Sequence, residues 1–148
     1  MIVFDTEADD LLDGITKFWV FGWTTDGKEF HQTTNPDKFL EVLDQQEMAA
    51  CHNCIRYDFP ALLKILGYTY NGLKIDTLAL SQYLYPSRPK HGLESWGEDL
   101  GVPKVYVDPD DWKDLDIAVA RKRVVEDVKI NTKLWKLQQR DLENLYDK

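Results

Sequence analysis

The chain has 148 residues, of which 43% are hydrophobic and 30% charged. This length allows one domain with a substantial core, and the composition is that of an ordinary globular protein. It contains no long apolar run and no cationic leader, so we expect a cytoplasmic protein without a membrane span or a secretory signal. The formal net charge of −8 argues against a nucleic-acid partner, unless divalent cations bound to the acids reverse the local field.

Two acidic residues follow the first apolar run of the chain. Ile2, Val3 and Phe4 are β-formers and predict a short buried strand. Asp5 and Glu7 come at its end, and residues two apart on a strand share a face. Two neighbouring carboxylates repel each other, whereas Mg²⁺ and Mn²⁺ prefer oxygen ligands. One interpretation is therefore a metal site, and the other is an acidic surface turn.

An antiparallel meander is expected next. Residues 15–25 are rich in β-branched and aromatic side chains, Asp26-Gly27 is a two-residue hairpin signal, and residues 28–33 supply the return strand. Asn35 then caps a helix that has Pro36 in its first turn and continues to about Gln46.

Strands and helices alternate through the rest of the chain. We expect strands over residues 48–52 and 68–75, helices over 57–66, 76–84 and 92–100, a loop over 102–114, and a final helix, continuous or split, over 115–146. Gly67 is placed to end the helix that begins at Tyr57. This order predicts an α/β fold, with a mixed sheet that has helices on both faces.

Cys51 and Cys54 form a Cys-x-x-Cys pair. A redox pair is one interpretation, but such a motif should open a helix in a thioredoxin-like βαβ unit. Two thiols are also too few for a structural zinc site. We expect reduced thiols without a chemical role.

Two further acids fall where elements begin or pack. Asp58 starts a helix, either as an ordinary N-terminal acid or as a ligand at the end of the sheet, and Asn53 in the preceding turn holds either the loop or a substrate phosphate. Asp127 follows Val124 by three residues, on or beside the apolar face of the final helix. A buried charge there needs a partner, either Arg123 at i−4 or a metal ion.

Three stretches of the sequence resemble, in order, the three motifs of the DEDD superfamily of 3′-5′ exonucleases, which has a ribonuclease H-like fold. They are Phe4-Asp5-Thr6-Glu7, the segment from His52 to Leu62 with its Asn53 and Tyr57-Asp58, and Glu126-Asp127-Val128. The likeness is to the proofreading domain of phage family A DNA polymerases and covers nearly the whole chain. It implies a single exonuclease domain over residues 1–148, in the host cytoplasm if a phage encodes it.

The resemblance also implies a two-metal-ion mechanism with Mg²⁺ or Mn²⁺. Asp5 would bridge the two ions, Glu7 and Asp127 would complete one of them, and Asp58 would support the other. The implied substrate is an unpaired 3′ end of DNA, with little base specificity. The implied substrate-binding residues are Thr6, Leu11 as a wedge beside the terminal base, Asn53 and Tyr57. We add Arg123, which either contacts the scissile phosphate or holds Asp127, with a plain ion pair on the helix surface as the alternative. A core position for Leu11 and simple packing for Tyr57 are the alternatives.

One position departs from the family pattern. The third motif usually has a Tyr four residues, or a His five residues, before its Asp, and here Arg123 and Lys122 stand there. Arginine stays protonated and cannot act as a base, and we expect Lys122 to be exposed. The alternatives are thus a weak or inactive domain that binds nucleic acid or a partner, or an exonuclease acting on RNA or oligonucleotides. A polymerase partner is a further expectation, whether the protein stands alone or forms part of a polymerase.

Overall fold

The computed structural model describes residues 1–102 and 109–146, and its centre is a five-stranded sheet with the order β3-β2-β1-β4-β5. The first two pairings are antiparallel and the other two are parallel, as the sequence predicts. The strands are β1 (Ile2–Ala8), β2 (Phe18–Thr24), β3 (His31–Thr33), β4 (Met48–Cys51) and β5 (Leu73–Asp76). The helices are α1 (Pro36–Asp44), α2 (Asp58–Leu66), α3 (Thr77–Leu84), α4 (Leu93–Leu100), the 3₁₀ helix η1 (Pro109–Asp114) and α5 (Ile117–Tyr146).

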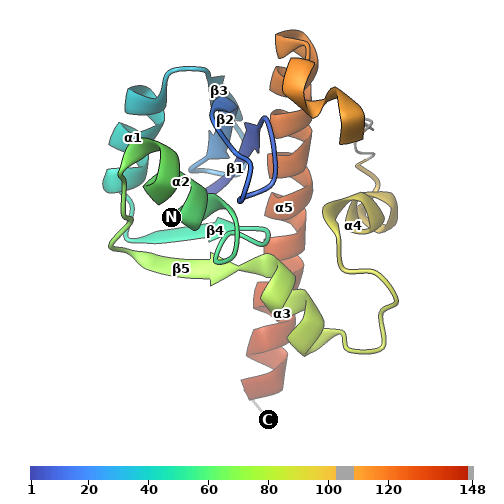
Figure 1. Ribbon diagram of the computed structural model, residues 1–148. Coiled ribbons are helices and arrows are strands. Elements are labelled where there is room, and N and C mark those ends of the chain that lie inside the picture. Colours follow the sequence, from blue (N-terminus) through green and yellow to red (C-terminus); the bar gives the residue numbers. More distant parts are fainter. Residues whose placement is uncertain (103–108, 147–148) are drawn as a thin grey trace.

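Helices cover both faces of the sheet (Figure 1). Side chains alternate along β1, so Ile2 and Phe4 point to the face covered by α1 and α2, where they join the largest core cluster. Val3 points to the opposite face and packs against Val128 of α5. The α3 and α4 helices lie against α5 (Figure 1). None of the described helices combines the length and the apolar character that a membrane span requires.

The first strand is longer than the sequence predicts. It pairs with β2 from Val3 to Ala8, so Asp5 and Glu7 lie inside the strand and not after its end. The parallel neighbour β4 pairs only with Ile2 and Val3. Both acids therefore lie beyond the carboxyl end of β4, at the edge where α/β folds usually bind ligands.

The meander is confirmed, but the two-residue hairpin and the long return strand are wrong. Trp23 of β2 pairs with His31 of β3, so a wide loop joins the strands. Oδ1 of Asp26 accepts hydrogen bonds from the backbone amides of Lys28 and Glu29, at 2.8 and 2.9 Å. These bonds give residues 28–30 a local alternative to pairing with the strand, which shortens β3.

The predicted helix ends are largely confirmed. Oδ1 of Asn35 accepts a bond from the amide of Asp37 at 3.0 Å, and Gly67 ends α2 in the left-handed conformation, with φ 63°. The final helix is continuous over 30 residues. Of the loop predicted over 102–114, residues 109–114 form η1, and residues 103–108 lie outside the described part.

Candidate metal centre

Three carboxylates from two elements meet on one side of the sheet. Asp5 and Glu7 are on the β1 face that points to α5, and Asp127 lies on the buried face of that helix. One oxygen from each residue lies within 4.8 Å of the other two. Glu7 and Asp127 are almost completely buried, at 4% and 3% exposure. The structure thus brings together three of the four predicted ligands.

A glycine allows α5 to come this close. Gly22 of β2 is the register partner of Asp5, and a Cβ atom there would lie only 2.9 Å from either methyl carbon of Val124. Real Cβ atoms essentially never approach another atom so closely, so any larger residue would push the helix away. Val124 precedes Asp127 by about one turn on the same helix face, so the contact at Gly22 brings Asp127 to Asp5.

The electrostatics of the cluster fit a divalent cation. The pKa of Asp5 is raised well above its ordinary value, mainly because burial removes water and further because Asp127, Glu7 and Asp58 carry like charges. Oδ2 of Asp5 is buried and has no hydrogen-bond partner among the residues that the structure describes. Hard cations such as Mg²⁺ bind carboxylate oxygens and would relieve both the repulsion and the missing bond.

Asp58, the fourth predicted ligand, lies on the other side of β1. Its Oδ1 accepts a hydrogen bond of 2.5 Å from Oγ1 of Thr6, whose side chain alternates away from Asp5 and Glu7. Burial raises the pKa of Asp58 to about 7, although the bond from Thr6 opposes this shift. Asp58 is near enough to raise the pKa of Asp5 through its charge, but it is not part of the three-acid cluster.

Arg123 makes an ion pair with an acid of the cluster. Its Nε lies 3.5 Å from Oε1 of Glu7, and its guanidinium carbon lies 4.9 Å from the ring centroid of Trp112. The sequence predicts Asp127 at i+4 as the ordinary partner of Arg123. Spacing along the helix cannot show that β1 also brings Glu7 to Arg123. Lys122 is exposed, as expected.

A cleft of about 660 Å³ opens beside the acids. It is lined by Thr6, Glu7, Ala8, Asp9, Asp10, Leu11, Tyr57, Trp112 and Lys113. The side chain of Leu11 is not in the core, because the residue is 77% exposed. The hydroxyl of Tyr57 donates a bond of 2.6 Å to the carbonyl of Asp10, so this residue also holds the loop that presents Leu11.

Trp112 and Lys113 are lining residues that the sequence does not reveal. They belong to η1, in a stretch that reads as an acidic loop, and no spacing relates them to the three motifs. Both residues line the cleft, and Trp112 of η1 lies against Arg123 of α5. A signal was present only in the composition, since a tryptophan in a polar loop needs a surface to pack against.

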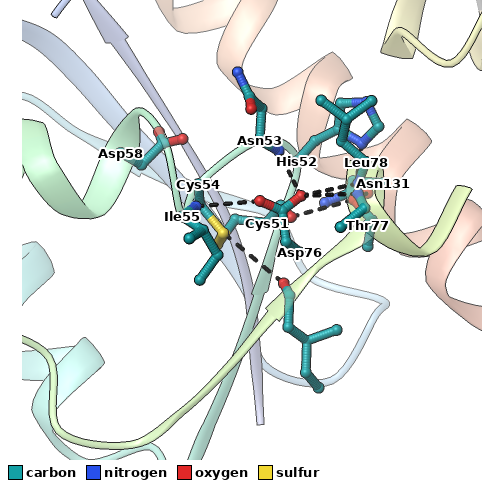
Figure 2. The surroundings of a disulfide bond; sticks show 12 residues. Cys51, His52, Asn53, Cys54, Ile55, Asp58, Asp76, Thr77, Leu78 and Asn131 are labelled. Atoms are coloured by element: carbon teal, nitrogen blue, oxygen red, sulfur yellow. Dashed lines mark hydrogen bonds between the residues drawn. A yellow bond between two sulfur atoms is a disulfide. The ribbon is translucent and has the colours of Figure 1, made fainter. Parts of the chain in front are cut away.

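Asp76 organises the turn before α2 (Figure 2). Its carboxylate accepts hydrogen bonds from the backbone amides of Asn53, Ile55 and Leu78, at 2.9, 3.1 and 3.0 Å. Asn53 has φ 64°, a left-handed conformation that asparagine tolerates. Its side chain points away from Asp76, so the backbone of Asn53, and not its amide group, holds the loop (Figure 2).

Cys51 and Cys54 form a disulfide, so the expectation of reduced thiols is wrong. Figure 2 shows the bond in the turn that leads from β4 to α2. Both residues are fully buried, and Cys51 of β4 is the register partner of Asp76 on the neighbouring strand β5. The bond therefore closes a turn that Asp76 also holds, four residues before Asp58. The sequence did not show that the turn brings the two sulfur atoms together.

Comparisons with known proteins identify a similar polymerase and solved structures with a similar fold. No protein-family model matches the chain. The DNA-directed DNA polymerase of Escherichia phage T7 is 27% identical over 136 alignment positions, which cover 70% of this chain. The match covers 19% of the polymerase, so this chain spans about a fifth of that relative's length.

Solved structures share the fold over almost the whole chain. Brucella melitensis NrnC has a TM-score of 0.75 and 20% identity, covering 97% of this chain and 74% of that one. The family B DNA polymerase of the archaeon Pyrobaculum calidifontis has a TM-score of 0.67 and 16% identity, covering 92% of this chain and 24% of the polymerase chain. The protein therefore has the ribonuclease H-like fold of the DEDD exonuclease superfamily, as its three motifs predict.

Proposed function

We propose that this protein is a metal-dependent 3′-5′ exonuclease that removes nucleotides from unpaired 3′ ends of DNA. The observation that carries the proposal is the cluster of half-buried Asp5 with buried Glu7 and Asp127, which has oxygens within 4.8 Å of one another. Buried like charges repel strongly unless a cation is present. The relation to a DNA-directed DNA polymerase supports DNA as the substrate.

The chain supplies ligands for two divalent cations, Mg²⁺ or Mn²⁺. Asp5, Glu7 and Asp127 would hold one, and Asp58, oriented by Thr6, would support the other with Asp5. Bound cations of this kind activate a water molecule for in-line attack on the phosphodiester and stabilise the charge that develops on it. A structure of NrnC contains Mg²⁺, which supports the choice of metal.

Arg123 takes a different role from the usual tyrosine. Its guanidinium remains protonated and cannot remove a proton from water. It instead holds Glu7 and supplies positive charge beside the phosphate site. Leu11, Asn53 and Tyr57 remain the proposed contacts to substrate, with Leu11 as the wedge at the terminal base.

The 148 residues form, in this proposal, a single exonuclease domain with a proofreading role. A polymerase partner, on the same chain or another, would deliver mispaired 3′ ends. Since terminal bases splay apart when mispaired, an exonuclease that needs an unpaired end removes errors preferentially. Primer extension by a candidate polymerase with and without this protein, on matched and mismatched primers, tests that role.

RNA or short oligonucleotides are the second candidate substrate, because NrnC has been solved with bound pGG. A third candidate is a domain that binds 3′ ends without cutting them, which Arg123 at the usual tyrosine position favours. Digestion of DNA, RNA and dinucleotides side by side separates the first two. Absence of any metal-dependent cleavage would leave the third.

The direct experiment uses single-stranded DNA labelled at its 5′ end. With Mg²⁺ or Mn²⁺, the protein should shorten this DNA one nucleotide at a time from the 3′ end, and EDTA should stop the reaction. Asp5→Asn should abolish cleavage, because it removes the central carboxylate without changing its shape. Asp37→Asn, on the exposed surface of α1, is the matched control and should be fully active. Degradation that survives EDTA or Asp5→Asn contradicts the proposal.

A further inference from the structure

The cleft beside the metal centre is lined by aromatic as well as acidic side chains. Glu7 connects the cleft to the carboxylate cluster, and Trp112 and Lys113 bring the only indole and the only cationic side chain to its described lining. Lys113 is exposed and free to reach a phosphate, whereas Trp112 is half-buried. An indole and an ammonium group side by side match the two parts of a nucleotide, a flat base and a phosphate.

Trp112 is held in place before any ligand arrives. The indole nitrogen of Trp19 donates a hydrogen bond of 2.9 Å to the backbone carbonyl of Trp112. The side chain packs against the core cluster of Val20, Leu115, Ala120 and Val124, and the centroid of its ring lies 4.9 Å from the guanidinium carbon of Arg123. A ring fixed in this way loses little conformational entropy when a ligand stacks on it.

The geometry points to Trp112 as the residue on which the terminal nucleobase stacks, and so as a determinant of which 3′ ends are degraded fastest. This inference rests on the proposed exonuclease function. Leu11, 77% exposed on the same cleft, contributes an apolar contact but no π surface. Stacking tolerates every base, yet it is stronger for the larger ring systems. The substrate class is therefore an unpaired 3′ end, with terminal purines bound better than terminal pyrimidines by a few fold.

The test compares Trp112→Phe with Trp112→Leu. Phenylalanine keeps an aromatic ring, whereas leucine keeps only the apolar packing. The probes are three single-stranded DNA oligonucleotides of one sequence that end in adenine, in cytosine, or in a 3′-terminal abasic site. Affinity is measured by fluorescence anisotropy in Ca²⁺, and KM and kcat are measured in Mg²⁺. Trp135→Leu, in a core cluster outside the cleft, controls for the loss of a tryptophan as such.

Stacking on Trp112 predicts that Trp112→Leu binds the adenine-ended strand about 10-fold more weakly, in the range that base–aromatic stacking supplies. Trp112→Phe should bind within a few fold of the wild type. All proteins should bind the abasic-ended strand equally, because no base is left to stack. A defect in Trp112→Leu that persists on the abasic end, or equal effects of Leu and Phe, would overturn the inference.

A positioning role through Arg123 gives a different pattern. It would lower kcat on all three substrates equally and leave KM unchanged, and that result also overturns the inference. If the wild-type protein shortens none of the strands, the proposed function fails. The anisotropy comparison still decides the role of Trp112 in that case. Thermal unfolding of each variant identifies any that fails to fold, and if Trp112→Leu does, Trp112→Met replaces it as the variant without an aromatic ring.

Discussion

Arg123 and Glu7 form an ion pair that joins α5 to β1, with 3.5 Å between Nε and Oε1. Both side chains are nearly buried, at 12% and 5% exposure, so water screens the pair little. Glu7 is also one of the three clustered acids. The arginine thus neutralises part of the charge that a metal-free cluster carries, and it fixes the side chain of a proposed ligand.

Replacing Arg123 should therefore reduce activity even when the replacement is the usual family residue. We expect Arg123→Tyr to lose activity, because Glu7 loses its ion pair with Arg123, and Arg123→Lys to fall between this variant and the wild type. Arg123→Met should lower the free energy of unfolding of the metal-free protein by about 3 kcal/mol, since it removes one partner of a buried ion pair. Urea denaturation and exonuclease rates provide the measurements. Faster cleavage by Arg123→Tyr would show that arginine limits the rate.

The stability of the metal-free protein should fall as the pH rises from about 4 to about 7. Burial raises the pKa of Asp58 from 3.8 to about 7, and the pKa of Asp5 is also raised. In this pH range the folded state therefore binds protons that the unfolded chain has already released. The free energy of unfolding falls as the pH rises towards the pKa values of the folded state. The pKa values of three other acids are lowered, so their effect on stability falls at lower pH than this range; they are Asp9, Asp26 and Asp141.

Urea denaturation in EDTA at pH 5 and pH 8 measures this fall. Added Mg²⁺ should reduce it, because the cation binds the deprotonated carboxylates. Asp58→Asn should show a shallower fall than the wild type, since the substituted side chain does not titrate. Stability that increases between pH 5 and pH 8 in EDTA would contradict the assignment of raised pKa values.

Gly22→Ala should weaken metal binding without touching a ligand. The new Cβ would lie 2.9 Å from the methyl carbons of Val124, so α5 must shift and carry Asp127 away from Asp5. Overpacking of this kind costs about 1–3 kcal/mol of stability. The double variant Gly22→Ala/Val124→Ala restores the space and should recover Mg²⁺ affinity, measured by calorimetry. Failure to recover would mean that the helix is positioned from elsewhere.

The sequence predicted which helices and strands form better than it predicted where the strands begin and end. Asn35 and Gly67 mark helix ends because their effects on the backbone are local. The length of β1 was underestimated because its acids read as a turn, whereas pairing with β2 carries the strand through Ala8. The alternation along that longer strand explains why Asp58 bonds to Thr6 and stays apart from the other three acids. The contacts of Trp112 depend on tertiary packing alone, so no spacing in the sequence predicts them.

The disulfide should make a modest contribution to stability. It closes a loop of only four residues, from Cys51 to Cys54. Closing a loop of that size lowers the conformational entropy of the unfolded chain, which stabilises the folded state by about 2 kcal/mol. We expect Cys51→Ala/Cys54→Ala to lose about this much in urea denaturation. Dithiothreitol should destabilise the wild type equally and leave the double variant unchanged. A dithiothreitol effect on the double variant would point to another cause.

Tyr57→Phe should separate the two roles of this tyrosine. Phenylalanine keeps the ring that lines the cleft but loses the 2.6 Å bond to the carbonyl of Asp10. Since that bond holds the loop carrying Leu11, we expect about 1 kcal/mol less stability and a raised KM for single-stranded DNA. Lys64→Met, which removes bonds to the carbonyls of Leu12 and Asp13 in the same loop, should raise KM similarly. If Tyr57→Phe raises KM and Lys64→Met does not, the hydroxyl contacts the substrate itself and does not act through the loop.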